Sequence, residues 1–530
     1  MRRSRFGAVA IGLLSLTLVA AACGSSAKKT ATSESSSTTA VATSSTTSAS
    51  NGTTTTSGPQ PQTMDQWEAL WANERSAIIK RIKDNKWGKS ADGKTVTGPI
   101  GFTIDLSKCP AGWNDSEGLS DTSIKIGQTL AQSGTLAASL YYGKGQDAIL
   151  AYYSDKGAFK DVNGKTRKVQ YIQKDDGYDP ARTIPQVDEL IDSEKVFAMI
   201  TLGSPNTMKT YDKLNQRCVP HIFNQTGHPA WGDPVNHPWT AGLGLAYTTE
   251  AVLWGAFIDQ HINEFPGGKV TVASLVVNNE FGKIYDVGFK AYLATSVNKD
   301  KINYVSETVE PQAPTITDPM TTLASKNPDV FISMTAGTFC AQSVVEAAQN
   351  GMHGKVKYMW QPNTCAGTTQ LSKAKVGGDG SASEGWWIVN GGNKDILDPA
   401  QQSDPAIKWA REILTNKGID PAADNNLGLG MIYGWAWAQT LQIAGSLDGG
   451  LNRSNLLLAA RSLDVINPFQ LTGMTFHADG NKDSYFTEGG IYQQWETAKQ
   501  SWSNRGTVIN LDGKSKNCNF DQASGVCKLY

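Results

Sequence analysis

The sequence lacks an excess of charge of either sign, and after its first 22 residues it lacks a hydrophobic run long enough to cross a membrane. Its 48 Lys and Arg residues nearly balance 49 Asp and Glu residues, which gives a net charge of −1. Proteins that bind nucleic acid usually need a basic surface to replace phosphate counterions, so nucleic acid is not expected as a partner. The best apolar run, Val252 to Ile258, has seven residues, whereas a membrane helix needs about 20.

The sequence also lacks the motifs that mark common catalytic sites. It contains no GxxxxGK[ST] phosphate loop, no HExxH zinc motif and no GxSxG nucleophile turn. Gly143 to Ala148 matches a loose GxGxxA pattern, but it lies inside a predicted helix, whereas a dinucleotide loop joins a strand to a helix. We therefore expect no catalytic residue and no cofactor.

Two groups of polar residues could nevertheless suggest catalysis. His221, His228 and His237 lie in one loop region, but no carboxylate stands at tight spacing beside them, so solvent-facing or capping roles are predicted. Asp175 and Asp176 are adjacent at a strand end, where neighbouring side chains point apart, and we expect them to cap the loop. An exported hydrolase that uses the histidines remains a less favoured alternative.

The cysteine pattern predicts disulfide bonds. Of seven cysteines, Cys23 directly follows the leader and is set apart as the predicted lipidation site, and six remain. No CxxC or HxxxH spacing suggests a metal site. An even number in an exported chain favours disulfides, although six cysteines allow 15 pairings. We expect no bound metal, and the pairs that we favour are Cys109–Cys218, Cys340–Cys365 and Cys518–Cys527.

The first 63 residues read as a leader and a tether. Three arginines precede an apolar stretch from Phe6 to Ala22, which is typical of a secretory signal peptide, and Ala20-Ala21-Ala22-Cys23 resembles a bacterial lipobox. Lipidation of Cys23 is therefore predicted, with an ordinary signal peptide as the alternative. Between Gly24 and Gln60, 22 of 37 residues are Ser or Thr and none is aromatic. Such a segment cannot bury enough apolar area to fold, so 23–63 is predicted to be a disordered tether.

From Asp121 onward, short β-rich runs alternate with longer helical runs. A strand at 124–127 precedes a helix at 137–156, and the same alternation continues through strands near 168–173, 196–202 and 219–223. It restarts after about Leu243, which indicates two lobes, each with a parallel sheet flanked by helices. The long apolar helix at 426–447 contains Trp435 and Trp437, which we expect to be core residues and not a binding box.

Several motifs in this region resemble one family. Over about residues 120–500, the chain resembles the leucine/isoleucine/valine-binding proteins, the type I extracellular substrate-binding proteins of ABC importers, and its Cys109-Pro110-Ala111-Gly112-Trp113 segment resembles an actinobacterial branch. The motifs that carry the resemblance are Ile124–Gly127, Gln132-Ser133-Gly134, Asp175–Pro180, Gly203–Thr207, Asn279–Gly282 and, more weakly, Glu384-Gly385-Trp386.

The resemblance implies an α/β, two-lobe type I periplasmic-binding-protein fold with a small N-terminal extension. The implied domains are a signal peptide at 1–22, the lipidated tether at 23–63, the extension at 64–118, lobe one at 120–246 plus 391–472, lobe two at 247–390 plus 473–505, and a disulfide-clipped tail at 506–530. The implied role is a monomeric lipoprotein on the outer face of the membrane, which captures a small molecule and delivers it to an ABC permease. A ligand-sensing ectodomain or co-receptor with the same fold is the alternative.

The resemblance also implies a ligand site between the lobes. The loop from Ser204 through Asn206 to Thr207 would hold a carboxylate or similar anion, with Gln225 and Thr226 as the second such loop, and Ser133 is a further predicted ligand contact. Tyr141 or Tyr142 would cover the apolar part of the ligand. From lobe two, Phe281, Phe339 and Asn363 complete the predicted contacts.

One departure from the family bears on the ligand. Amino-acid binders of this family pair the ligand ammonium with a carboxylate that follows the strand ending here at Trp360, and a buried cation without such a partner is costly. Here that loop reads Gln361-Pro362-Asn363-Thr364-Cys365, without an acid. Either an acid such as Glu280 replaces it, or the ligand is an amide, an organic acid or a larger apolar acid.

Overall fold

A computed structural model describes residues 60–529. The predicted signal peptide, Cys23 and nearly all of the predicted tether lie outside the described residues. Among the described helices, none combines the length and the apolar character that spanning a bilayer requires.

The N-terminal extension begins with helix α1 (Met64–Asp84), which is capped by Thr63 and Gln66 in a reciprocal capping box. Trp67 and Trp71 on this helix are buried in the same hydrophobic core as the first lobe. The indole N–H of Trp71 also donates to the carbonyl of Ile466 over 3.0 Å. A small antiparallel sheet follows, with the order β1 (Gly88–Lys89), β2 (Thr95–Thr97) and β3 (Thr103–Asp105).

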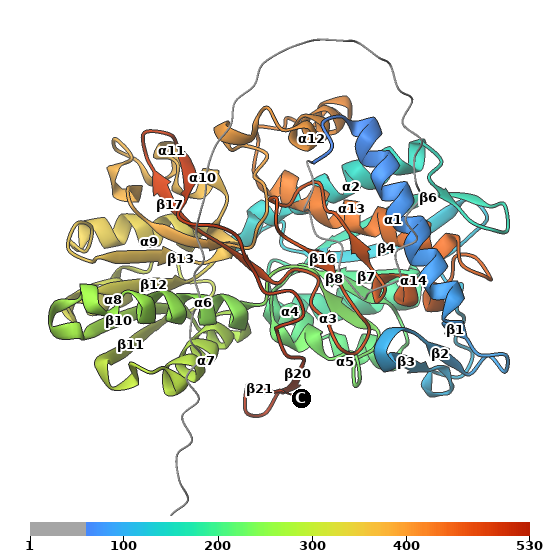
Figure 1. The fold of residues 1–530 in the computed structure, drawn as a ribbon, viewed down its shortest axis with the longest axis horizontal. Helices are drawn as coiled ribbons and strands as arrows, with labels where there is room; N and C mark the ends of the chain where they lie inside the picture. Colours follow the sequence, from blue (N-terminus) through green and yellow to red (C-terminus); the bar gives the residue numbers. More distant parts are fainter. Residues whose placement is uncertain (1–59, 530) are drawn as a thin grey trace, which may run out of the picture. The chain divides into compact units, whose positions relative to one another are not determined.

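The first lobe contains a six-stranded sheet in the order β5-β6-β4-β7-β8-β9. Only β5 pairs antiparallel in this sheet, with β6. The strands are β4 (Ser123–Leu130), β5 (Phe159–Lys160), β6 (Thr166–Asp175), β7 (Ala198–Thr201), β8 (His221–Asn224) and β9 (Thr240–Gly242). The helices that accompany it (Figure 1) are α2 (Leu140–Asp155), α3 (Pro180–Asp188), α4 (Ser204–Met208), α5 (Tyr211–Gln216), α12 (Pro405–Asn416), α13 (Asn426–Gly445) and α14 (Arg453–Ala460).

The second lobe contains a sheet in the order β11-β10-β12-β13-β14-β17-β18, with β19 also paired to β17. The first five strands are parallel, and β17 and β18 add to them antiparallel. The strands are β10 (Val270–Val277), β11 (Ile302–Val309), β12 (Val330–Met334), β13 (Tyr358–Gln361), β14 (Trp387–Asn390), β17 (Gly489–Glu496), β18 (Ser501–Asn504) and β19 (Ile509–Asn510). The helices are α6 (Tyr247–Gln260), α7 (Glu280–Thr295), α8 (Thr317–Ser325), α9 (Thr338–Gln349), α10 (Thr368–Leu371) and α11 (Lys373–Val376).

Two short hairpins complete the chain. β15 (Asp464–Val465) pairs with β16 (Phe476–His477), and β20 (Cys518–Asp521) pairs with β21 (Val526–Leu529). Phe476 and Phe486 pack in the first lobe's core, whereas β17, which begins only three residues after Phe486, belongs to the second sheet. The chain therefore passes between the lobes within this short stretch.

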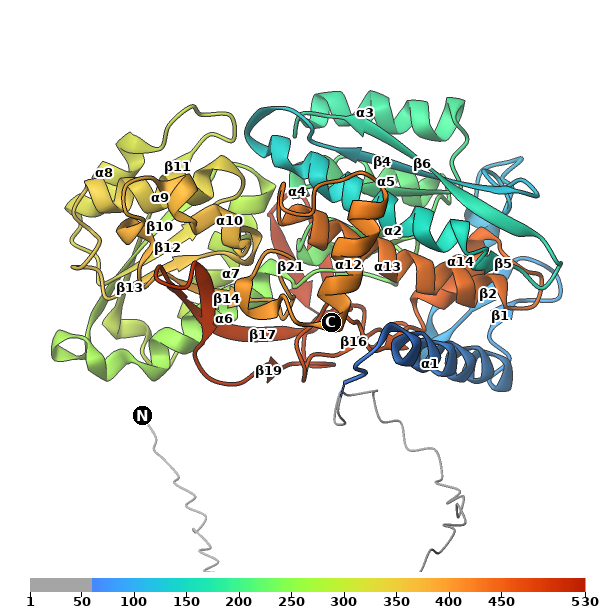
Figure 2. The same cartoon turned by 90° about the horizontal axis from the view of Figure 1, so that it is seen from above.

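Helices α2 and α13 lie side by side (Figure 2) because glycines remove the side chains between them. A Cβ atom on Gly145 would lie 2.0 Å from the Leu427 carbonyl oxygen, and one on Gly430 would lie 2.1 Å from the Tyr142 carbonyl oxygen. The GxGxxA pattern thus lies inside a helix, as expected, and serves close helix packing.

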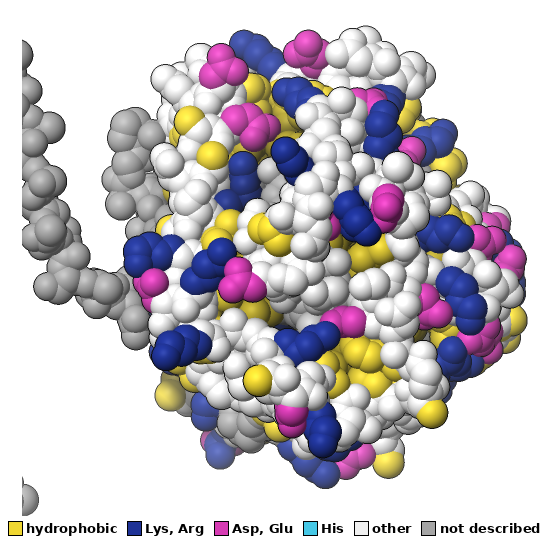
Figure 3. Space-filling view, turned by 90° about the vertical axis from the view of Figure 1, so that its right-hand side faces the viewer, with side chains coloured by type: hydrophobic (Ala, Val, Ile, Leu, Met, Phe, Trp, Pro, Cys, Tyr) yellow, Lys and Arg dark blue, Asp and Glu magenta, His cyan; other side chains and the backbone are white. Residues whose placement is uncertain are grey.

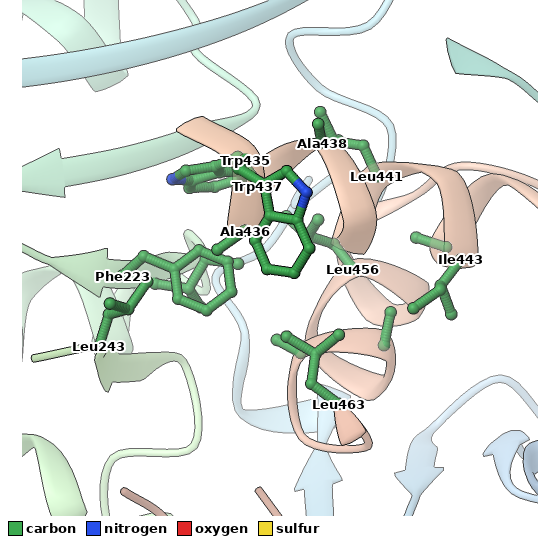
Figure 4. Packing of buried hydrophobic residues seen from close by; sticks show 14 of the residues in the cluster. Phe223, Leu243, Trp435, Ala436, Trp437, Ala438, Leu441, Ile443, Leu456 and Leu463 are labelled. Carbon is green, nitrogen blue, oxygen red and sulfur yellow. The ribbon is translucent and has the colours of Figure 1, made fainter. Parts of the chain in front are cut away.

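Trp435 and Trp437 on α13 are core residues, as predicted. Both are fully buried, and the ring of Trp437 meets Phe223 of β8 edge-on at a centroid distance of 5.6 Å (Figure 4). The core of the first lobe thus joins its central sheet, α13 and the N-terminal extension.

Three disulfides connect the pairs that we favoured. Cys109–Cys218 fastens the end of the extension to the segment before β8, with 5.6 Å between the Cα atoms. The other two bonds are Cys340–Cys365 and Cys518–Cys527.

The surface carries both signs of charge. On the face shown in Figure 3, Lys and Arg side chains are interspersed with Asp and Glu and do not form one continuous basic patch. This distribution agrees with the nearly neutral composition.

Candidate functional site

Residues from both lobes and from the segments that join them line a cavity of about 110 Å³. Amide and hydroxyl side chains predominate in its wall, with Lys394, Asp395 and Asp398 from the segment after β14. The lining residues are Tyr142, Gln225, Thr226, Gly227, Gly244, Leu245, Tyr247, Asn363, Thr364, Ala366, Gly367, Asn390, Asn393, Lys394, Asp395, Asp398, Gln401, Asn425, Leu429, Tyr433, Gln493 and Trp502.

The close packing of α2 and α13 positions one wall of this cavity. Tyr142 of α2 and Tyr433 of α13 meet edge-on, with 6.3 Å between ring centroids, and both line the cavity. Tyr247, at the start of α6, adds a third ring from the second lobe. The cavity therefore has a phenolic wall with both apolar faces and hydroxyl groups.

Gln225 and Thr226 follow β8, and a buried network fixes them. The Gln225 side chain accepts from Gln128 over 2.7 Å and donates to Gln146 over 2.8 Å. The hydroxyl of Thr226 lies 2.8 Å from that of Ser204, which is itself fully buried. Ser204 thus supports the cavity wall from behind and does not line it.

Asn363, which follows β13, is held by a buried acid behind it. The Asn363 backbone N–H donates to Glu250 over 2.6 Å, and the Asn363 side-chain oxygen accepts from the Gly391 N–H over 2.8 Å. Glu250 also accepts from the Tyr285 hydroxyl, and burial raises the pKa of Glu250 to about 8. Glu250 and Glu280 do not line the cavity.

Acids from the segment after β14 do line the cavity. Asp395 accepts from the backbone N–H groups of Thr368 and Leu397, each over 2.8 Å, and desolvation raises the pKa of Asp395. The neighbouring Lys394 pairs with Asp404 over 2.8 Å instead. Within residues 60–529, no salt bridge to Asp395 is present, so this acid has backbone donors but no cationic partner.

Asp398 accepts more hydrogen bonds than Asp395. It accepts from the Ala400 N–H over 2.9 Å, from the Ser501 hydroxyl over 2.7 Å and from the Gln401 amide over 3.0 Å. Its hydrogen bond to Ser501 joins the segment after β14 to β18.

Of the eleven predicted ligand contacts, Tyr142, Gln225, Thr226 and Asn363 line the cavity. Four predicted polar residues bond instead to neighbours in the fold. They form the pairs Ser133 to Asp175 (2.8 Å), Asn206 to Asp176 (2.9 Å), Thr207 to Thr201 (2.6 Å) and Ser204 to Thr226 (2.8 Å). Asp175 and Asp176 also accept from the backbone N–H groups of Gly177 and Tyr178 in their own loop, which is the predicted capping role.

The remaining predicted aromatic residues also lie outside the cavity wall. Phe281 packs edge-on against Tyr247 at 5.1 Å, and Phe339 is buried in the second lobe's core. Tyr141 lies outside the wall, with the Lys144 ammonium 5.4 Å from its ring centroid.

Tyr178 occupies the space beside the Ser204 loop. A Cβ atom on Gly203 would lie only 2.3 Å from the Tyr178 ring, and the Tyr178 hydroxyl accepts from Asn279 of the second lobe over 3.4 Å. The cavity wall instead includes residues from the segments that join the lobes, such as Lys394 and Asp395.

For the three histidines the prediction is a solvent-facing or a capping role, and the structure shows the capping role at His228. His221 and His228 are buried, and burial lowers the pKa of each to about 3. His228 does cap the turn that follows it, because its ring accepts from the Ala230 N–H. His237 lies between Asp212 at 2.8 Å and Asp233 at 3.2 Å, and although burial opposes protonation, these acids raise its pKa to about 9. None of the three lines the cavity.

Residues 123–489 match the sequence profile of the periplasmic binding proteins. The chain belongs to this family. A search of curated proteins finds no significant match.

Solved structures agree with the fold of this periplasmic binding protein. A branched-chain amino acid ABC transporter protein from Thermus thermophilus with bound valine matches with a TM-score of 0.62 and 15% identity, over 74% of this chain and 97% of that one. A fatty acid ABC transporter substrate-binding protein from Thermomonospora curvata matches with a TM-score of 0.60 and 17% identity, over 76% and 95%. A solute binding protein from Rhodopseudomonas palustris HaA2 in complex with p-hydroxybenzoic acid gives 0.58 and 16%, over 74% and 98%. The predicted two-lobe type I α/β fold is thereby confirmed.

Proposed function

We propose that this periplasmic binding protein is the extracellular solute receptor of an ABC importer, which captures a small molecule and delivers it to a membrane permease. Family membership and the cavity between the two lobes support a binding role. The apolar leader and the Ala20-Ala21-Ala22-Cys23 segment support export and lipid anchoring on the outer face of the membrane. Binding would favour a closed arrangement of the lobes by population shift.

The composition of the cavity wall supports a small polar ligand. Seven side-chain amides, each able both to donate and to accept hydrogen bonds, line it together with tyrosine and threonine hydroxyls. These amides are Gln225, Asn363, Asn390, Asn393, Gln401, Asn425 and Gln493. A long acyl chain would leave many of these groups unpaired, which is costly in an enclosed site.

The position of Asp395 decides which class of ligand we favour. Asp395 faces the cavity without a cationic partner; a ligand ammonium placed there would supply one, and a ligand amide N–H would supply a further hydrogen-bond donor. An anionic organic acid would instead meet the carboxylates of Asp395 and Asp398. Among branched-chain amino acids, amides and organic acids, we therefore favour the ligands that carry an amino or amide nitrogen. In this proposal, Asp395 takes the role of the acid missing from the loop of Asn363.

A thermal-shift screen of the full chain, purified in detergent, tests the proposal with amino acids, amides and organic acids as probes. A ligand at 100 times its dissociation constant stabilises the fold by about 2.7 kcal/mol. We expect hits among amines or amides, with the shift lost in Asp395→Asn and kept in Asp379→Asn, an exposed acid outside the cavity.

Two other outcomes would separate the parts of the proposal. Hits only among organic acids, unaffected by Asp395→Asn, would keep the receptor and refute the assignment of Asp395. No stabilisation by any class would count against the receptor itself.

A further inference from the structure

A second group of chemistry-bearing side chains lies away from the cavity, where the C-terminal segment meets the first lobe. His477 on β16, Asp483 in the following turn and Asp512 after β19 place their ligand atoms within 4.8 Å of one another. β16 and β19 are labelled in Figure 2. The three side chains are 11%, 3% and 17% exposed, so they form an enclosed group. None of them lines the ligand cavity.

Asp483 is the unusual member of this group. Its side chain is nearly fully buried, yet neither of its carboxylate oxygens accepts a hydrogen bond from any described residue. A buried carboxylate normally has several donors, because leaving it unpaired costs much free energy. The His477 ring lies beside it: Nδ1 of His477 is 3.4 Å from the Asp483 Oδ2 and likewise has no hydrogen-bond partner among the described residues.

The distances fit a shared metal ion better than a direct ion pair. A charge-assisted hydrogen bond between nitrogen and a carboxylate oxygen is about 2.7–2.9 Å long. Nδ1 of His477 instead lies 3.4 Å from Asp483 and 3.5 Å from Asp512. Two ligands of a tetrahedral zinc ion, each about 2.0–2.1 Å from the metal, stand roughly 3.3 Å apart.

The surrounding contacts hold the ligands in place. The Thr475 hydroxyl donates to Asp512 Oδ1 over 3.0 Å. The backbone N–H groups of Gly513 and Ser515 donate to Glu488 over 2.5 and 2.8 Å, which fixes the loop that carries Asp512. Such supporting bonds around the ligands are typical of metal sites.

We propose that His477, Asp483 and Asp512 bind one divalent transition-metal ion, zinc by preference, with water as a fourth ligand. One imidazole nitrogen and two carboxylate oxygens suit zinc, whereas Ca²⁺ and Mg²⁺ prefer sites made of oxygen alone. The ion would join the loop after β19 to the β16 hairpin and so fasten the C-terminal segment to the first lobe. It would stabilise the folded chain and take no part in binding the solute.

Zinc titration of the full chain tests this site. The protein is purified in detergent, stripped with EDTA and titrated with zinc, and bound metal is measured by mass spectrometry and by thermal unfolding. We expect one zinc per chain and a higher melting temperature. Asp483→Asn should weaken binding by roughly 100-fold or more, since even supporting residues change metal affinity by 10–100-fold. Asp479→Asn, four residues away in the same hairpin and outside the group, should bind zinc like the parent.

Further measurements keep the test decisive if Asp483→Asn fails to fold. Asp512→Asn and His477→Gln should show the same loss of zinc affinity, and Thr475→Val should show a loss of about 10-fold. Co²⁺ bound in place of zinc should give the visible absorption of a tetrahedral site. Zinc binding that is equal in the parent and in all three ligand variants would overturn the proposal, as would no retained zinc in the parent. A preference for Ca²⁺ over zinc would overturn the choice of metal.

Discussion

The contact between α2 and α13 leads to a prediction about both stability and the cavity. Replacing Gly430 with alanine would place a methyl group 2.1 Å from the Tyr142 carbonyl oxygen, whereas ordinary contact begins at 3.4 Å. The two atoms must separate by 3.4 − 2.1 = 1.3 Å. The obstacle is a backbone carbonyl in the first turn of α2, so it cannot rotate away as a side chain could.

The expected size of the effect follows from two opposing terms. Alanine gains about 1 kcal/mol over glycine in a helix interior. Overpacking a buried site costs about 1–3 kcal/mol, occasionally more. Because the clash is with backbone, we expect a cost at or above the upper end and a net loss of about 2 kcal/mol. The shift should also weaken solute binding, because Tyr142 and Tyr433 on the two helices form one wall of the cavity.

Urea denaturation followed by tryptophan fluorescence measures this loss. Gly288→Ala in α7 is the matched control, because its new methyl group would meet the Thr248 side chain at 3.2 Å and the Thr248 Cα at 3.3 Å, where an adjustment of a few tenths of an ångström suffices. We expect Gly288→Ala to be close to neutral. If Gly430→Ala unfolds at the same urea concentration as Gly288→Ala, the glycines do not set the approach of α2 to α13, and the reasoning fails.

Three further predictions concern the N-terminal half. Burial raises the pKa of Glu74 to about 8, so the folded state keeps a proton that the unfolded state releases. The free energy of unfolding should therefore fall as the pH rises from about 4.5 to 8. Urea unfolding at pH 5.5 and 9 should show this fall, and Glu74→Gln should reduce it. Replacing Cys109 and Cys218 together with serine opens a link across 109 residues and should cost about 2–5 kcal/mol in the same assay; an unchanged midpoint would contradict it. Cys23→Ser should move the exported protein from the membrane fraction to the medium, and retention in the membrane would refute lipid anchoring.

The sequence predicted those parts of the structure that a repeating pattern specifies. Strands such as β7 and β10 are short, mostly apolar and mostly buried, and α13 is a long and mostly apolar segment, so their type follows from composition and length. The positions of Thr226 and Asn363 in the ligand site could also be predicted, because the residues that follow parallel strands lie at one edge of the sheet. Both line the cavity.

The acids and amides contributed by the joining segments could not be predicted in this way. Asp395 and Gln493 lie where the alternation of strands and helices has ended, and only the crossing of the chain between the lobes brings them to the cavity. For His237, the same limit hides only one partner, because Asp212 lies 25 residues away in sequence, whereas Asp233 lies four residues before it and was a signal that could have been used. A signal was available for Asp395, since it was an unassigned acid in the segment predicted to cross between the lobes.

The disulfide Cys109–Cys218 has a mechanical consequence for a chain that is pulled from its N-terminus. Tension applied at residue 60 would first peel α1 away, withdrawing Trp67 and Trp71 from the core, and then the small sheet. The peeling would stop at Cys109, because from there the load passes through a covalent bond into the segment before β8. The segment released between residue 60 and Cys109 has 109 − 60 = 49 residues and spans about 170 Å when fully extended. The central sheet of the first lobe would stay folded meanwhile. The extension would thus unfold under tension up to a fixed length, and the two lobes would be spared this unfolding.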